Sequence, residues 1–354
     1  MKKLILTLMA AASVCGAFAQ EATKITAGKH NDYGLSYSLP NTMVDIVVSV
    51  TKVTAKRGPY YRYAEKYLGV QELVTEDMEY YELNGITIRP VGVANPDESY
   101  VVKFKSGNPP SMYLSESGAL LSINVKPEAT ATVPAAKLTP AQSNITQSAS
   151  YGVLSEEQLA AGSTAKQAEM AAKQIYRLRE SRTNLITGDV DQLPADGESM
   201  KLIMKQLDEQ EAALTAMFLG TTSRAVSEEV IRINPATTTG KEMLFRFSKY
   251  MGVVDNDNLS GSPIYVAGKI IDDFRLTEEE AKKSKSKNKG VAYIRPGKMQ
   301  LTLSSENKTL TSLEFQVAQL GEVMQFPSDM FDDKKAPAKA IFSPETGAVL
   351  EVVQ

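Results

Sequence analysis

The chain has 354 residues, a formal net charge of −3, one cysteine, one histidine and no tryptophan. A mildly acidic chain without basic blocks argues against nucleic acid or an anionic membrane surface as its main partner. One cysteine and one histidine cannot supply a Cys/His zinc site, and a single cysteine cannot form an internal disulfide.

Residues 1–19 have the features of a secretory signal peptide. Two lysines precede an apolar run from Leu4 to Val14, and an A-x-A site ends at Ala19. The run is about half the ~20 residues that a membrane span needs. A lipoprotein signal at Cys15 is disfavoured because the preceding residues lack the usual leucine and small-residue pattern. We expect cleavage after Ala19 and a mature protein that is periplasmic or associated with the outer membrane, without a membrane span.

Cleavage would change the net charge to −5, because two lysines leave, and would remove the cysteine. The remaining chain of about 335 residues is long enough for two ordinary domains held by their cores alone. Residues 20–33 form a polar leader that contains His30, the only histidine. We expect His30 to be a solvated loop residue, so that a Ser-His-Asp triad is disfavoured.

Residues 34–126 predict an N-terminal β unit with one short helix. Apolar and polar residues alternate from Val44 to Val50, and Pro40-Asn41 predicts a turn between a short strand and this longer one. Asn84-Gly85 predicts a two-residue hairpin, although a bulge in one long strand would have the same sequence. The strand pattern continues to the segment "GALLSINV".

The stretch "GPYYRYAEKYLG" at 58–69 predicts a helix of two to three turns. Pro59 suits the first turn, and Gly69 suits the left-handed position beyond the end. The residues that share one face at spacings of three and four are Tyr60, Tyr63, Ala64, Tyr67 and Leu68. This stripe favours burial in a core. The alternative, a stacking platform for sugar or peptide, is best supported at Tyr61, which points away from the stripe.

Residues 127–163 are rich in Pro, Ala, Thr and Ser and predict a linker or a crossover along the surface. Residues 164–220 predict an antiparallel helical hairpin, because 165–186 and 200–219 keep a helical period over five or more turns. The apolar stripes are Ala168, Ala171, Ala172, Ile175, Leu178, Leu185 and Ile186 on the first helix, and Met200, Ile203, Met204, Leu207, Leu214, Met217 and Phe218 on the second. We expect them to form a core, the alternative being a methionine-rich partner groove.

Opposite charges on the two helices give weak support to the hairpin, because exposed ion pairs contribute little. The first helix carries Lys173, Arg177, Arg179 and Arg182, and the second carries Asp208, Glu209 and Glu211.

Residues 221–354 predict a C-terminal β unit of nine short strands, with a charged loop or short helix between Phe274 and Gly290. The segment "ESGALLSINV" at 116–125 is similar to "ETGAVLEVVQ" at 345–354. This internal similarity suggests two related units that each end in a hairpin with a glycine at its turn.

Motifs for catalysis and ligand binding fail on their key positions. Residues 237–241 resemble the end of a phosphate-binding loop, but Pro235 stands at the leading glycine and Glu242 at the Ser/Thr. Residues 255–261, "DNDNLSG", begin like a calcium loop but lack the glycine at the sixth position and the bidentate glutamate at the twelfth. We therefore predict no catalytic residue, no cofactor and no metal site, and we assign no partner-binding residues. A catalytic carboxylate pair stays an alternative, because a glycosidase needs only two acids at a defined separation and the chain has many, so enzyme activity stays undecided.

The chain resembles the secreted Bacteroidales family designated domain of unknown function 4831. The resemblance rests on "GLSYSLPNT", "GPYYRYAEKYLG", "PDESYVV", "GVAYIRPGKMQLTL", "VAQLGEVMQFP" and "FSPETGAVLEV", which cover most of the mature chain in order. The family pattern often has phenylalanine where Leu320 stands. The resemblance implies a periplasmic or outer-membrane-associated protein and brings no catalytic residues with it.

Together these features predict a mainly β protein with helices (α+β), in which two antiparallel β-rich units are joined by a long antiparallel helical hairpin. The expected function is that of an exported, non-catalytic interaction or scaffold protein of the cell envelope that binds another envelope protein. The alternative is a carboxylate-based hydrolase or a carbohydrate-binding protein. The partner and the oligomeric state stay open.

Overall fold

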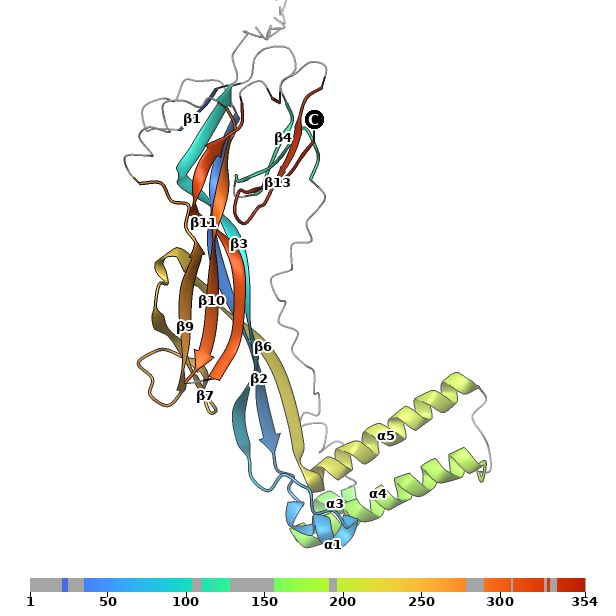
Figure 1. Cartoon of the computed structure of the whole chain (residues 1–354). Helices are drawn as coiled ribbons and strands as arrows, with labels where there is room; N and C mark the ends of the chain where they lie inside the picture. The colour runs from blue at the N-terminus through green and yellow to red at the C-terminus, as the bar shows by residue number, and fades with distance from the viewer. Residues whose placement is uncertain are drawn as a thin grey trace, which may run out of the picture.

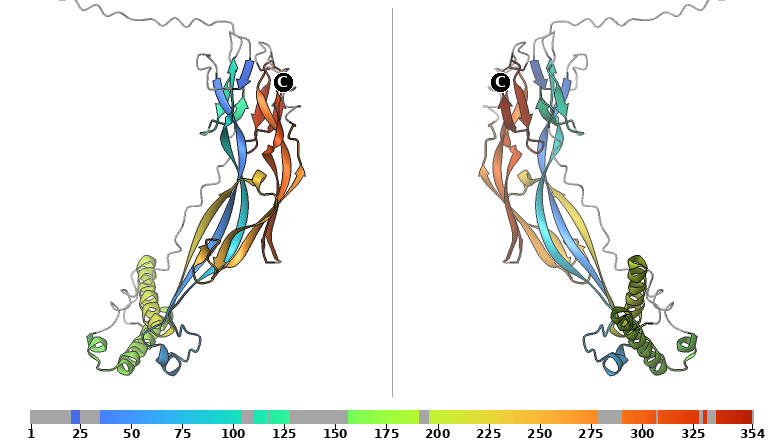
Figure 2. Two further views of the ribbon diagram at one scale, coloured as in Figure 1. Left: turned by 90° about the vertical axis from the view of Figure 1, so that its left-hand side faces the viewer. Right: turned by 90° about the vertical axis from the view of Figure 1, so that its right-hand side faces the viewer.

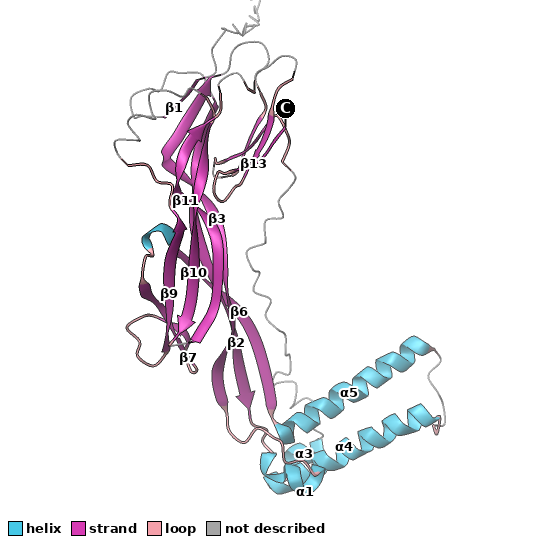
Figure 3. Ribbon diagram, in the orientation of Figure 1, coloured by secondary structure: helices cyan, strands magenta, loops and turns pink. Residues whose placement is uncertain are grey.

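A computed structural model describes residues 21–24, 35–103, 110–116, 118–127, 156–190, 196–277, 290–306, 308–327, 330–331 and 336–353. The described chain is elongated, with β-sheets over most of its length and a group of helices at one end (Figure 1). It is mainly β with a few helices, which confirms the expected α+β class (Figure 3). The predicted signal peptide, His30 and most of the 127–163 crossover and of the charged loop lie outside the described residues.

The strands are β1 Glu21–Lys24, β2 Leu35–Lys56, β3 Met78–Lys103, β4 Met112–Leu114, β5 Leu120–Ile123, β6 Thr221–Ile233, β7 Lys241–Ser248, β8 Gly252–Val254, β9 Ser262–Asp272, β10 Ala292–Ser305, β11 Lys308–Gln325, β12 Lys339–Phe342 and β13 Val349–Val353. The helices are η1 Tyr61–Tyr63, α1 Ala64–Leu68, α3 Glu156–Ala160, α4 Thr164–Thr187, α5 Gly197–Leu219 and η2 Pro235–Thr237. The strands form three sheets with the orders β1-β3-β2-β6, β11-β10-β9-β7-β8 and β13-β12-β5-β4.

Two very long antiparallel strands, β2 and β3, run along the molecule. The predicted turn at Pro40-Asn41 is wrong, because β2 continues through it with a register shift against β3. The predicted hairpin at Asn84-Gly85 is also wrong, and the alternative of a bulge is confirmed by a second shift at this point. A bulge accommodates the extra residue without reversing the chain, because the two strands stay paired on both sides of it.

Several strands predicted separately are continuous in the same way. "GVAYIRP" and "KMQLTLS" are both part of β10, and Pro296 lies at a register shift between Arg295 and Gly297. Proline is tolerated there because a bulged position does not need an N–H for the ladder. Likewise "TSLEFQVAQL" and "EVMQFP" both contribute to β11.

The middle of the molecule is a two-layer sandwich. Alternate residues of β2, from Val44 to Val50, are at most 2% exposed and point at the second sheet. They pack against apolar residues of β9, β10 and β11, including Met299, Leu301 and Leu303. The apolar residues at every second position from Val44 to Val50 therefore form one buried face of β2.

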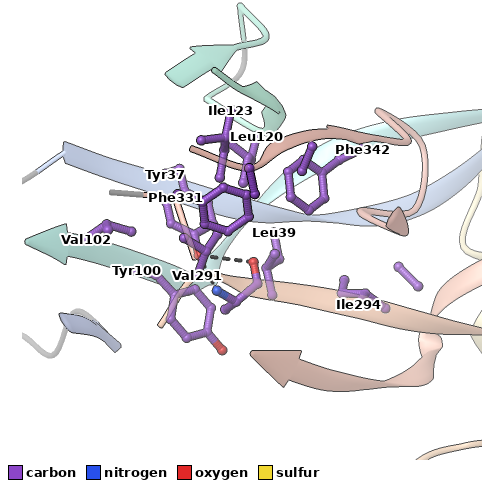
Figure 4. Packing of buried hydrophobic residues seen from close by; sticks show 14 residues of the cluster. Tyr37, Leu39, Tyr100, Val102, Leu120, Ile123, Val291, Ile294, Phe331 and Phe342 are labelled. Carbon is purple, nitrogen blue, oxygen red and sulfur yellow. Dashed lines mark hydrogen bonds between the residues drawn. The ribbon is translucent and has the colours of Figure 1, made fainter. Parts of the chain in front are cut away.

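A second core lies at the end of the sandwich farthest from the helices (Figure 4). Tyr37 is buried there, and its hydroxyl both donates to the carbonyl of Ala292 (3.0 Å) and accepts from the amide of the same residue (2.7 Å). Phe331 and Phe342 pack into the same cluster. The hydroxyl thus satisfies a backbone donor and acceptor that would otherwise be buried without partners.

The two similar segments, 116–125 and 345–354, lie in neighbouring hairpins of one sheet. The turn between β4 and β5 has Gly118 at φ 88°, and the turn between β12 and β13 has Gly347 at φ 68°. β5 pairs with β12, so the two hairpins lie side by side. Strands from 34–126 and 221–354 also meet where β2 pairs with β6. The two β ranges of the sequence therefore share two sheets.

The third core holds the helices together at the end of the long β ribbon, by which we mean the paired strands β2, β3 and β6. The stretch at 58–69 forms one 3-10 turn followed by a short α-helix, and Gly69 ends it in the left-handed conformation at φ 68°. Tyr60 is 3% exposed, and its ring lies 5.4 Å from that of Phe218 on α5. The residues that pack around this core include Tyr63, Tyr67 and Leu68. The predicted core role of the tyrosine stripe is confirmed.

Candidate interaction surface

The two long helices are antiparallel and leave the β ribbon as a projecting hairpin (Figures 1 and 2). Ser163 caps α4 by accepting from the amide of Lys166, and Asp196 caps α5 by accepting from the amide of Ser199. Such caps satisfy amides that have no partner within the helix. At 1.5 Å per residue each helix is roughly 35 Å long.

Ion pairs cross between the helices about half-way along the hairpin. Arg179 Nε lies 2.7 Å from Glu211 Oε1, and Arg182 Nη2 lies 2.8 Å from Glu211 Oε2. Arg182 also pairs with Asp208. The carboxylate of Glu211, whose side chain is 15% exposed, therefore receives two guanidinium groups. The expected juxtaposition of opposite charges occurs at these positions.

These ion pairs separate a packed half of the hairpin from an unpacked half. All buried residues of α4 lie between Ala168 and Leu178, and all those of α5 lie between Ala213 and Phe218. None of the described residues from 179 to 190 or from 196 to 212 is buried. The large apolar residues in these ranges are Leu185, Ile186, Val190, Met200, Leu202, Ile203, Met204 and Leu207, of which Leu207 is partly buried against the third core. The stripe predicted as core is thus core only next to the ribbon.

We call the distal half, Arg179–Thr187 and Gly197–Ala212, the hairpin tip. Ile186 is 70% exposed, Leu202 is 60% exposed and Ile203 is 39% exposed. Helices in water gain most of their stability from packing an apolar face, and isolated short helices are marginal. In the hairpin tip Ile186, Leu202 and Ile203 are exposed, whereas Leu185, Met200 and Met204 are half-buried and Leu207 packs against the third core.

A second exposed feature is the free edge of β6. This strand pairs with β2 over its whole length without a register shift. Its other edge has no neighbour among the described strands, and none of its residues is buried. Long regular edges are ready templates for pairing with another chain.

The outer face of the sheet carries a charge cluster that is structural. Asp45 is 3% exposed and lies directly opposite Arg89 on β3 and Arg232 on β6. Arg232 binds both of its carboxylate oxygens, at 2.7 and 3.1 Å, and Arg89 binds one of them at 3.3 Å. The hydrogen bonds from Arg232, followed by the charges of both guanidinium groups, hold the pKa of Asp45 below its usual value. The cluster therefore ties β3 and β6 to β2.

The displaced carboxyl pKa values in the described part of the chain are all lowered, by cations or by N–H donors. Lys173 and Lys166, for example, lower the pKa of Glu169 to about 2. A general acid needs the opposite shift. Within the described ranges no group of three or more His, Cys, Asp or Glu side chains could hold a metal ion.

The motifs examined in the sequence occupy ordinary structural positions. Pro235–Thr237 is a single 3-10 turn capped by the side chain of Asn234, and Thr238 is buried behind it. Residues 255–261 form the connection between β8 and β9, in which Asn258 donates its amide N–H to the carbonyl of Asp255 (3.1 Å). The ring of Tyr61 lies beneath the guanidinium groups of Arg57 and Arg62, at 5.3 and 5.5 Å.

The geometry thus defines an elongated α+β protein with a projecting helical hairpin. The chain belongs to the family described as domain of unknown function (DUF4831), whose model matches residues 33–350. Neither the curated proteins nor the solved structures compared with the chain gave a match. Of the described helices, none combines the length and apolar character needed to cross a membrane.

The sequence alone assigned no partner-binding residues. The apolar stripes of the two helices run on into the hairpin tip, so their pattern did not distinguish the tip from the packed half. The available signal was the group of ionisable residues at 208–211 in the middle of the apolar stripe of the second helix. Such an interruption can mark the point where a helix stops packing against its own protein.

Proposed function

We propose that this protein is a non-catalytic interaction or scaffold protein of the cell envelope, exported by its signal peptide, and that the hairpin tip binds another envelope protein. The observation that carries the proposal is the absence of any buried residue in the hairpin tip, although the tip contains seven large apolar side chains. A partner that covers them would supply the packing that the helices otherwise lack.

The form of the surface also suits a protein partner. Amphipathic helices typically bind in apolar grooves through residues spaced by three, four and seven positions. On α5, Met200, Ile203, Met204 and Leu207 have this spacing. Ile203 is exposed, Met200 and Met204 are half-buried, and Leu207 lies at the margin of the third core. Methionine adapts to irregular partner surfaces. Charged residues around the apolar side chains, including Lys201 and Lys205, would form a polar rim.

The alternative of a carboxylate hydrolase has no specific support in the described residues. A retaining glycosidase needs two acids about 5–5.5 Å apart, with one of raised pKa. The carboxylates whose pKa is displaced instead bind arginine, lysine or backbone N–H groups, as Asp45 and Glu169 do. We therefore favour recognition by shape over catalysis.

Site-specific photocrosslinking in the native envelope tests the proposal. A photoreactive residue at Leu202, 60% exposed, is compared with one at Tyr250, 74% exposed in a turn of the sandwich. We expect one discrete crosslinked species from position 202 that disappears when Ile186→Glu is added, and no such species from position 250. Equal crosslinking from both positions, or a species unaffected by Ile186→Glu, contradicts the proposal.

A further inference from the structure

The free edge of β6 suggests a second interaction, independent of the hairpin tip. β6 is 13 residues long, has no proline and pairs with β2 without a bulge. Val226 is 43% exposed and Val230 is 52% exposed, both on the outer face of the sheet. Natural edge strands are usually protected by proline, bulges or a covering element. Within the part of the chain that the structure describes, the only such protection of β6 is its mixture of charged residues.

The order of these charges is self-complementary in one register. We propose that two copies of the chain join by antiparallel pairing of their β6 edges, with Val226 of each copy on the twofold axis. Arg224 of one copy then lies opposite Glu228 of the other, twice by symmetry. Thr222 lies opposite Val230. Opposite charges that face each other across strands are stabilising, and the edge-to-edge pairing is isologous, as a twofold dimer requires.

Neighbouring registers lack this match. A twofold axis perpendicular to the sheet keeps the outer faces of both copies on the same side. Because neighbouring residues of a strand point to opposite faces, the axis must pass between a residue and its own copy. An axis at Ser227 places Val226 opposite Glu228 and leaves Arg224 without an acid. An axis at Glu228 places this residue opposite its own copy and Arg224 opposite Arg232, and like charges in direct opposition are destabilising.

Within one chain Arg224 already binds Glu82, at 3.0 Å. The two side chains are 60% and 40% exposed, and exposed pairs of this kind contribute little. Exchanging or sharing this contact in a dimer therefore costs little. The joined sheet would run continuously through both copies, in the order β1-β3-β2-β6 followed by its symmetry equivalent.

Cysteine crosslinking of purified protein tests both the dimer and its register. The chain from Gln20 onward contains no cysteine, so Val226→Cys introduces the only thiol. Facing residues of antiparallel strands have Cα atoms about 4.5–5.5 Å apart, which suits a disulfide. The control is Val230→Cys, which is similarly exposed. In the proposed register its two copies are eight positions apart along the strands, or roughly 27 Å.

We expect Val226→Cys to give a covalent dimer on mild oxidation and Val230→Cys to give no covalent dimer. Sedimentation equilibrium of the cysteine-free protein should show a reversible dimer. Glu228→Arg should weaken it by roughly tenfold or more, and adding Arg224→Glu to that variant should restore it. A monomer at every concentration, or equal crosslinking of both cysteine variants, overturns the proposal. The test does not involve the hairpin tip, so its failure leaves the proposed function unaffected.

Discussion

Phe218→Ala should unfold the helical end of the molecule while the sandwich stays folded. Phe218 is fully buried and packs against the ring of Tyr60, with ring centroids 5.4 Å apart. Truncation of a buried phenylalanine costs about 3–5 kcal/mol, to which loss of an aromatic pair adds about 1 kcal/mol. The core around Phe218 is separate from the two cores of the sheets. The loss therefore falls on the helices, which are marginal without it.

Hydrogen exchange measured by mass spectrometry can follow the two parts separately. In Phe218→Ala we expect amides of α4 and α5 to lose protection, the circular dichroism signal at 222 nm to fall, and amides around Leu301 to keep their protection. The matched control is Leu202→Ala, because Leu202 is 60% exposed and its loss should change stability by less than about 0.5 kcal/mol. Unchanged protection of α4 and α5, or one transition that removes both parts together, would refute separate cores.

Three further substitutions test other parts of the fold. Asp45→Asn should lower the free energy of unfolding by about 1–3 kcal/mol at pH 7. The pKa of Asp45 is lowered in the folded state, so its stabilisation is present above the unfolded pKa of about 3.9 and lost as the pH falls through the folded value. Urea titrations should therefore show the gap between wild type and variant closing as the pH falls below the unfolded pKa, and a gap independent of pH would contradict this. Tyr37→Phe should cost about 1–3 kcal/mol in the same assay, because the backbone N–H and C=O of Ala292 lose a buried partner. A neutral result would show that another group satisfies them. Gly69→Ala should lower the thermal stability of the helical end by about 1 kcal/mol, because φ is 68° and nothing lies near the added carbon, so a larger loss would point to a steric clash instead.

Periodicity in the sequence was sufficient for the elements whose contacts are local. The 3.6-residue stripe placed both long helices, and Gly69 marked the end of the tyrosine helix, because helix formation and capping depend on near neighbours. The alternation from Val44 to Val50 identified the buried face of β2 for the same reason. The presence of one cysteine and one histidine also argued against a Cys/His zinc site and an internal disulfide, whatever the fold.

Only the tertiary structure decided whether a local signal marks a turn or a bulge. Pro40-Asn41 and Asn84-Gly85 both suit a chain reversal, but β2 and β3 pair on both sides of each. The extra residue of the second shift is Asn84, whereas those of the first lie on β3 between Ala94 and Ser99. The extent of burial along the hairpin was equally undetermined. An apolar stripe in the sequence indicates which face of a helix can pack against other residues. How far along the helix that face is packed depends on where the neighbouring core lies. That difference separates Leu214, which is buried, from Leu202, which is exposed and available to a partner.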